Sequence, residues 1–93
     1  MILGLYKVSG HSMLPHFKPK DRVLVSSLPY LFSKPAIGDA VLLKSNDKIL
    51  IKRISKFEGN KIIVSGDNKS DSLKIGSIDR GNILGKVIFI LNT

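Results

Sequence analysis

Residues 8–15 read Val-Ser-Gly-His-Ser-Met-Leu-Pro, and the interpretation of the whole chain starts from this stretch. A strand-like approach ends in a turn at Ser9 and Gly10, Ser12 follows, and Pro15 fixes the backbone three residues later. A serine hydroxyl is a weak nucleophile unless a neighbouring base accepts its proton. The best candidate for that base elsewhere in the chain is Lys52.

Lys52 lies in an apolar segment that has the character of a strand, in which side chains alternate between two faces. Leu50, Lys52 and Ile54 therefore share one face. Desolvation by such neighbours disfavours the ammonium form and lowers a lysine pKa from about 10.4 by up to about 3–5 when burial is complete. A lysine of this kind can accept the serine proton. The alternative is a lysine whose ammonium group reaches water along its apolar stem.

The composition predicts one folded domain over residues 1–93, with 43% hydrophobic and 24% charged residues. No cysteine is present, so disulfides and a thiolate nucleophile are excluded. The longest apolar run, Val87–Leu91, is far shorter than the ~20 residues of a membrane span, and the N-terminus lacks the pattern of a signal peptide. We therefore expect no membrane span.

The net charge of +8 raises the possibility of nucleic-acid binding. The fifteen basic residues are scattered along the chain, and the aromatic residues form no stacking motif between them. This pattern favours a solvated basic surface, and no specific nucleic-acid partner is expected.

Apolar alternation and turn residues predict a mainly β fold of short antiparallel strands with little helix. A helical turn is expected within residues 26–37, where Leu28–Phe32 either covers the core or edges a substrate cleft. Hairpin turns are expected at Ser45–Lys48 and Glu58–Asn60, and a polar loop from Gly66. The expected strands are residues 2–8, Val23–Val25, Ala40–Leu43, Ile49–Ile54, Lys61–Ser65 and Ile83–Leu91.

Several segments together resemble the type I signal peptidases and their relatives, a group whose fold is related to the self-cleaving repressor domains. The resemblance follows the order of the motifs and covers nearly the whole chain. The matching segments are residues 9–15 (serine box), 18–25, 38–41, 51–54 (lysine box), 66–72 (last polar box) and 83–87.

The resemblance implies a Ser/Lys endopeptidase with Ser12 as nucleophile and Lys52 as general base, acting without a metal or another cofactor. The Ser12 backbone N–H would form part of the oxyanion hole. Ser72 matches a serine that orients the lysine, and Asp67 matches a structural carboxylate. Met13 and Pro15 match residues that support the serine turn.

The chain departs from the family pattern at three places. His16 stands where a threonine usually follows the proline, and Leu73–Ile75 replaces an acidic-serine-arginine continuation. Gly10 offers no side-chain donor to the oxyanion, so Ser9 or a backbone N–H would have to supply the second one.

Other readings of the polar residues remain open. His16 is an alternative base for Ser12, and His11 with His16 could bind a metal, although no third ligand has a recognisable spacing. Surface or cleft-lining histidines are favoured over both. Ser45 and Lys48 match a serine-x-x-lysine pattern that lacks its companion motifs. The three aspartates that follow turn-forming residues are expected to stabilise turns: Asp21, Asp39 and Asp67.

The expected substrate is an extended polypeptide that pairs with strand edges near Lys7–Gly10 and Ile49–Ile51. The residues expected to bind it are Lys7, Val8, Ile49, Leu50 and Ile51. Small residues before the scissile bond are implied by the resemblance.

Within the resemblance, the compact form without an anchor is most similar to the maturation proteases of nickel superoxide dismutase. Those proteases remove a leader that blocks the metal-binding N-terminus of their client, which implies a cytoplasmic enzyme. A signal peptidase that cleaves exported preproteins, and a non-catalytic peptide-binding module, are the alternatives. The oligomeric state is left open.

Overall fold

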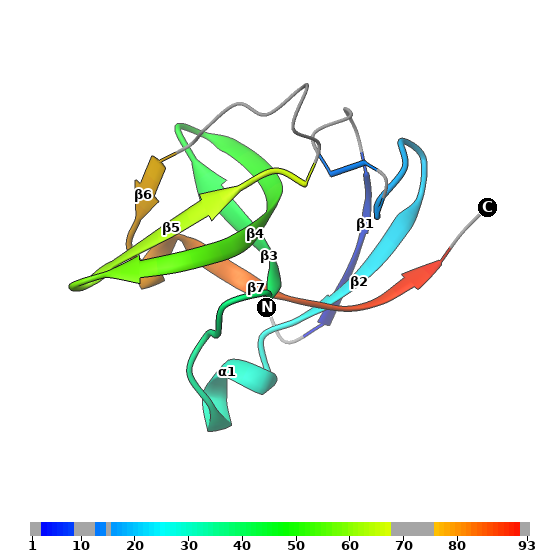
Figure 1. Ribbon diagram of the computed structural model, residues 1–93. Coiled ribbons are helices and arrows are strands. Elements are labelled where there is room, and N and C mark those ends of the chain that lie inside the picture. Colours follow the sequence, from blue (N-terminus) through cyan, green and yellow to red (C-terminus); the bar gives the residue numbers. More distant parts are fainter. Residues whose placement is uncertain (1–2, 9–12, 15, 68–75, 92–93) are drawn as a thin grey trace.

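The computed structural model describes residues 3–8, 13–14, 16–67 and 76–91. Within those residues, seven strands, one α-helix and one 3₁₀ helix follow one another along the chain (Figure 1). In chain order the elements are β1 (Leu3–Lys7), β2 (Arg22–Ser26), α1 (Pro29–Phe32), β3 (Ala40–Ser45), β4 (Lys48–Glu58), β5 (Lys61–Ser65), β6 (Gly76–Ile78), η2 (Arg80–Asn82) and β7 (Ile83–Leu91).

The strands form one antiparallel sheet in the order β1-β2-β7-β3-β4-β5-β6. The first half of β7 pairs with β3 and its second half with β2, so this strand joins the two sides of the molecule (Figure 1). The expected mainly β fold of short antiparallel strands with little helix is confirmed, and each expected strand is present. The sequence pattern does not predict β6, because three residues are too few to show alternation.

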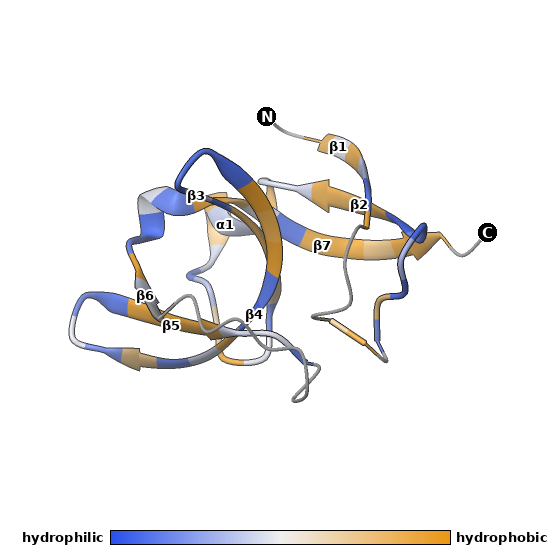
Figure 2. Cartoon of the chain, turned by 90° about the horizontal axis from the view of Figure 1, so that it is seen from above, coloured by the Kyte–Doolittle hydropathy of each residue, from blue (hydrophilic) through white to orange (hydrophobic). Residues whose placement is uncertain are grey.

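Two apolar clusters lie on opposite sides of β3, whose side chains alternate between them. Ala40 and Leu42 face the first cluster, while Val41 and Leu43 face the second. The apolar colour accordingly runs along the strands in Figure 2, whereas the β3–β4 turn is hydrophilic. The first cluster also holds Val8, Met13, Phe17, Val23 and Val25, and the second Ile54, Ile62, Val64 and Ile78.

Both expected hairpin turns are confirmed, and backbone conformation explains them. Asn46 and Asp47 have φ values of 49° and 65° between β3 and β4, as a two-residue type I′ turn requires. Ser45 and Lys48 are paired across this turn, so the serine-x-x-lysine pattern closes a hairpin. Gly59, with φ of 60°, makes the turn between β4 and β5.

The expected helical turn is present as α1, but it covers the core only through Tyr30. The Tyr30 ring packs against the second cluster, and its hydroxyl donates to Asp39 Oδ2 at 2.8 Å. Burial, and then this hydrogen bond, raise the pKa of Tyr30. Leu31 and Phe32 are 69% and 88% exposed. Among the described residues, none from α1 lines either pocket discussed below, so the expectation that this segment edges a substrate cleft gains no support.

Two of the three aspartates stabilise turns as expected. Asp21 accepts a hydrogen bond from the Lys18 backbone N–H at 3.0 Å, and Asp39 accepts one from the Ala36 N–H at 3.0 Å. Both side chains therefore hold the backbone that enters a strand, β2 in the first case and β3 in the second.

Candidate active site

Lys52 is buried in the middle of β4. It lies opposite Val41 of β3, and only 3% of the residue is exposed. Ile54, two residues further along the same face, is a member of the second apolar cluster, and Leu50 packs against that cluster. The expectation that alternation would place this lysine among apolar side chains is therefore confirmed, and the alternative of an ammonium group in open water is wrong.

Much of the expected serine motif lies outside the described residues. This applies to the nucleophile and to its neighbours Ser9, Gly10 and Pro15, as well as to Ser72 in the last polar box and to His11. Their assigned roles remain predictions. The described parts of the two segments are Met13, Leu14 and His16 on one side and Gly66 and Asp67 on the other.

The segment after the serine is anchored in the first apolar cluster. Met13 and Phe17 are each 3% exposed, and the Phe17 N–H donates to the Met13 carbonyl at 3.0 Å. Further along, the Lys20 N–H donates to the Val8 carbonyl, and the Val8 N–H donates to the Asp21 carbonyl. The segment from Phe17 to Asp21 thus returns to the end of β1 at Val8.

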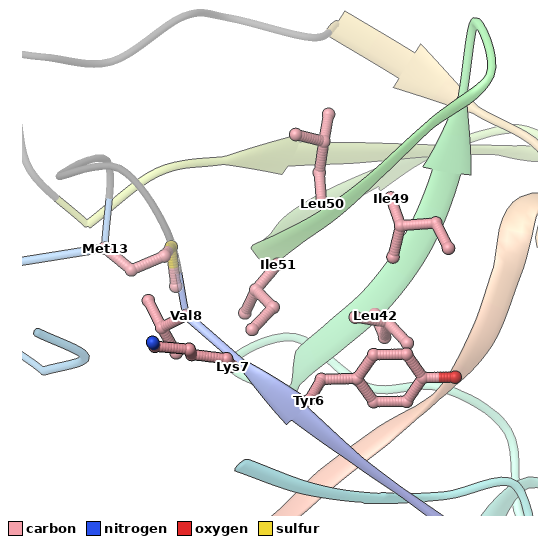
Figure 3. A pocket seen from close by; sticks show the side chains of 8 residues that line it. All are labelled: Tyr6, Lys7, Val8, Met13, Leu42, Ile49, Leu50 and Ile51. Atoms are coloured by element: carbon pink, nitrogen blue, oxygen red, sulfur yellow. The ribbon is translucent and has the colours of Figure 1, made fainter. Parts of the chain in front are cut away.

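A pocket of about 200 Å³ opens between the end of β1 and the start of β4 (Figure 3). All five residues that the sequence analysis assigns to substrate binding line it, which places the two expected segments side by side. Met13, from the segment after the serine, also lines it. The complete lining is Tyr6, Lys7, Val8, Met13, Leu42, Ile49, Leu50 and Ile51.

The strand edges at this pocket have no partner strand among the described residues. Within the described residues, β4 pairs with β3 through Lys48–Arg53, but with β5 only from Arg53 onward, so the second edge of its first half has no strand partner. β1 stands at the end of the sheet order, with β2 on one side. The backbone N–H and C=O groups of Val8 form hydrogen bonds on the side of β2. Successive residues of a strand point these groups to alternate edges, so those of Lys7 point to the edge away from β2.

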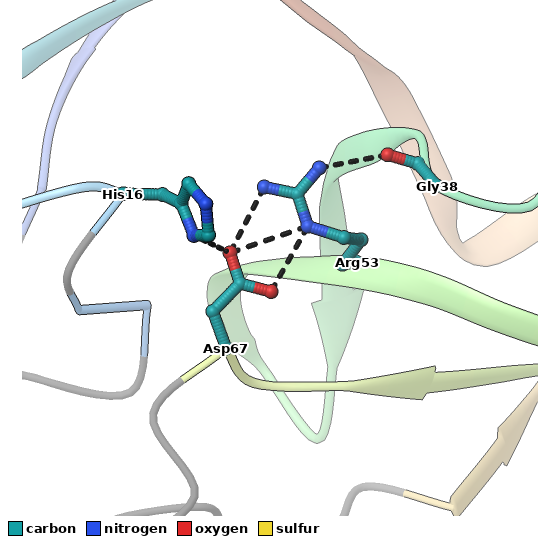
Figure 4. A network of polar contacts seen from close by, with 4 residues as sticks. All are labelled: His16, Gly38, Arg53 and Asp67. Atoms are coloured by element: carbon teal, nitrogen blue, oxygen red, sulfur yellow. Dashed lines mark hydrogen bonds and ion pairs between the residues drawn. The ribbon is translucent and has the colours of Figure 1, made fainter.

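A second arrangement centres on Asp67, which joins two distant segments (Figure 4). Arg53 donates from Nε to both carboxylate oxygens, at 2.9 and 3.2 Å, and from Nη2 to Oδ2 at 2.9 Å. Its Nη1 donates to the Gly38 carbonyl at 2.7 Å. His16 Nδ1 lies 2.9 Å from Asp67 Oδ2. The hydrogen bonds to Asp67 raise the pKa of Arg53, so the guanidinium stays charged.

The metal alternative depends on His11, which lies outside the described residues, so it stays untested. Among the residues that the structure describes, no group of three or more His, Cys, Asp or Glu side chains could hold a metal ion. His16 and Arg53 instead line an open hollow of about 570 Å³ together with Asp39 and Lys86. Lys86 Nζ lies 3.6 Å from Asp39 Oδ1, so the charges in this hollow are largely paired.

Sequence reasoning missed three contributors to these sites. Tyr6 and Leu42 line the pocket, and Arg53 holds Asp67. Tyr6 could have been found from the sequence, because it directly precedes Lys7, the first residue of the strand edge expected to bind substrate. Leu42 and Arg53 become visible only once the pairing of β3 with β4 and the path of the loop after β5 are known.

Comparison with known proteins supplies the family. No curated protein matches the chain. No helix in the described part of the chain is long and apolar enough to cross a membrane. The profile of the family described as Peptidase S24-like matches residues 3–88, which is nearly the whole sequence and includes both the serine and the lysine segments. This chain, with a lysine buried in the strand that borders its pocket, therefore belongs to the Peptidase S24-like family.

Proposed function

We propose that residues 1–93 form one serine endopeptidase domain in which Ser12 is the nucleophile and Lys52 the general base. Lys52 accepts the Ser12 proton as the hydroxyl attacks the substrate carbonyl, and returns it to the leaving amine. The Ser12 backbone N–H, with Ser9 or another backbone N–H, stabilises the oxyanion. Ser72 orients the lysine.

The burial of Lys52 carries this proposal. An ammonium group at the surface would hold its proton at neutral pH, whereas an apolar environment disfavours the charged form. Lys52 combines 3% exposure with a position on the same strand face as Leu50, which lines the pocket. In a family of peptidases, a buried lysine in the strand that borders the pocket is suited to activating a serine.

The proposed substrate is an extended polypeptide that adds a strand between β1 and β4. Its backbone would pair with the edge at Lys7 and with the edge at Ile49–Ile51, while one side chain enters the apolar pocket. As client we propose the precursor of nickel superoxide dismutase, and the support is the resemblance of this compact chain to the proteases that mature that enzyme. A leader covering its metal-binding N-terminus would be the segment removed, in the cytoplasm.

Incubation with this precursor tests the client. We expect the purified protein to remove the leader without detergent or lipid and to leave the metal-binding residue first, as read by mass analysis of the new N-terminus. The matched control is the Ser12→Ala variant, which should leave the precursor intact. Cleavage of exported preproteins, with this precursor untouched, would instead assign the chain to signal-peptide removal.

The pH dependence of the rate tests the base. Since Lys52 acts only when deprotonated, kcat/KM is expected to rise with pH through the range in which the lysine loses its proton, and then to level off. Single-turnover measurements keep product release from masking the chemical step. A rate that stays constant from neutral to alkaline pH, with chemistry limiting, contradicts a titrating lysine.

Two alternatives retain a structural observation in their favour. The contact of His16 Nδ1 with Asp67 resembles the pair formed by a histidine base and its orienting carboxylate, which would make His16 the base. The open strand edges also suit peptide capture without turnover. Covalent labelling of Ser12 by a peptide phosphonate separates a peptidase from a capture module, because capture needs no activated serine.

A further inference from the structure

Asp67 joins the three segments that carry the proposed catalytic residues. His16 comes four residues after Ser12, Arg53 is next to Lys52, and Asp67 precedes Ser72 by five residues. We propose that His16 is a positioning residue, whose contact with Asp67 (Nδ1 to Oδ2, 2.9 Å) holds the nucleophile segment in register with the lysine strand. The inference rests on the proposed Ser12 and Lys52 roles, but its structural part can be tested separately.

The Asp67 carboxylate that His16 contacts is held in place without His16. Arg53 makes three contacts with the Asp67 carboxylate and a fourth with the Gly38 carbonyl, so the carboxylate is tied to both β4 and the turn before β3. Asp67 is only 11% exposed, whereas His16 is 62% exposed. His16 is therefore the more exposed partner, and it contacts a carboxylate that Arg53 already holds (Figure 4).

The contact between His16 and Asp67 is expected to affect the position of the nucleophile segment more than the stability of the fold, because neighbouring residues already anchor this segment. Met13 and Phe17 already bury the turn in the first cluster, and an exposed ion pair contributes little to folding. These two side chains fix the turn at its ends, and His16 fixes its orientation relative to β4. A displacement of about 1 Å in a reacting group can cost about 10²-fold in rate, so a small reorientation is visible in catalysis.

The hydrogen-bond chemistry distinguishes positioning from proton transfer. Positioning needs only an N–H at Nδ1, which the imidazolium and one neutral tautomer both supply. A general base needs a free Nε2 lone pair, which the imidazolium lacks. The charged groups around the ring are Asp67 and Arg53, with Asp39 and Lys86 across the same hollow.

The variants His16→Asn and His16→Ala exploit this difference. The amide nitrogen of asparagine can donate to Asp67 from near the Nδ1 position but cannot act as a base. We expect His16→Ala to lower kcat about tenfold with little change in KM or Tm, and His16→Asn to recover most of the loss. The control is Glu58→Gln, which removes an exposed ion pair with Lys56 on the same strand and should leave kcat unchanged.

Each outcome decides the inference. Full activity in His16→Ala overturns it, and so does loss of about 10³-fold or more in both variants, which makes the ring itself the base. Amide exchange at Phe17 and Asp21 gives a readout that does not depend on turnover. Faster exchange in His16→Ala, restored in His16→Asn, supports the structural part even if the protein cleaves no peptide, in which case only the proposed function fails. Unchanged exchange in His16→Ala overturns the inference whatever the activity.

Discussion

Replacement of Ser12 or of Lys52 by alanine is expected to lower kcat/KM by at least about 10³-fold, the largest loss that we predict. Without Ser12 no acyl-enzyme can form, and without Lys52 the proposed base for its proton is lost. Because the two residues act as one unit, the double variant should be no worse than the single ones. Hydrolysis of a leader peptide under single-turnover conditions measures the effect.

The test of Lys52 needs a variant that preserves the packing around this residue. Lys52 is 3% exposed, so truncation to alanine leaves a cavity among Val41, Leu50 and Ile54. Lys52→Met keeps the apolar stem and removes the amine, and its Tm should equal or exceed that of the wild type while its activity is lost. Lys56→Ala, at an exposed lysine of the same strand, should retain full activity.

A different pattern of losses would assign the base elsewhere. If Lys52→Met retains activity while His16→Ala and His16→Asn are both inactive, the contact between His16 and Asp67 is catalytic and the lysine is structural. The comparison is clean, because the His16 ring is mostly exposed and its removal leaves no cavity in either apolar cluster.

Local alternation accounts for what could be predicted from the sequence. The period of two in β4 places Lys52 on the apolar face with Ile54, and the turn residues Asn46 and Asp47 fix where the hairpin closes. The same reasoning places Ile51 on the opposite face, where it packs against the first cluster. These features depend on neighbours within one strand or one hairpin, so the sequence contains enough information.

Contacts between distant segments could not be predicted in this way. The pairing of Arg53 with Asp67 depends on how the chain leaves β5, and the docking of His16 depends on the turn over Met13 and Phe17. Neither of these chain paths produces a periodic pattern in the sequence.

The packing around Gly85 also could not be predicted from the sequence, because it involves distant segments. Replacement of Gly85 should give the largest loss of stability that we predict. Gly85 lies in β7 where this strand passes from β3 to β2. A Cβ added there would meet Val25 Cγ1 at 2.7 Å and the Ser26 carbonyl oxygen at 2.9 Å. Neither can move away easily, because Val25 is fully buried and Ser26 is paired with β1 on its other side.

We therefore expect Gly85→Ala to destabilise the fold by about 1–3 kcal/mol, the usual range for overpacking. For a domain of this size, the corresponding decrease in Tm is about 5–20 °C. Gly81→Ala is the matched control, since a Cβ at Gly81 meets nothing within 4 Å, and its stability should stay within about 0.5 kcal/mol of the wild type. Thermal and urea unfolding of the three proteins measures the difference. Equal Tm values for the two variants would show that β2 can yield at Val25, and that the close approach of β7 to β2 does not limit the size of residue 85.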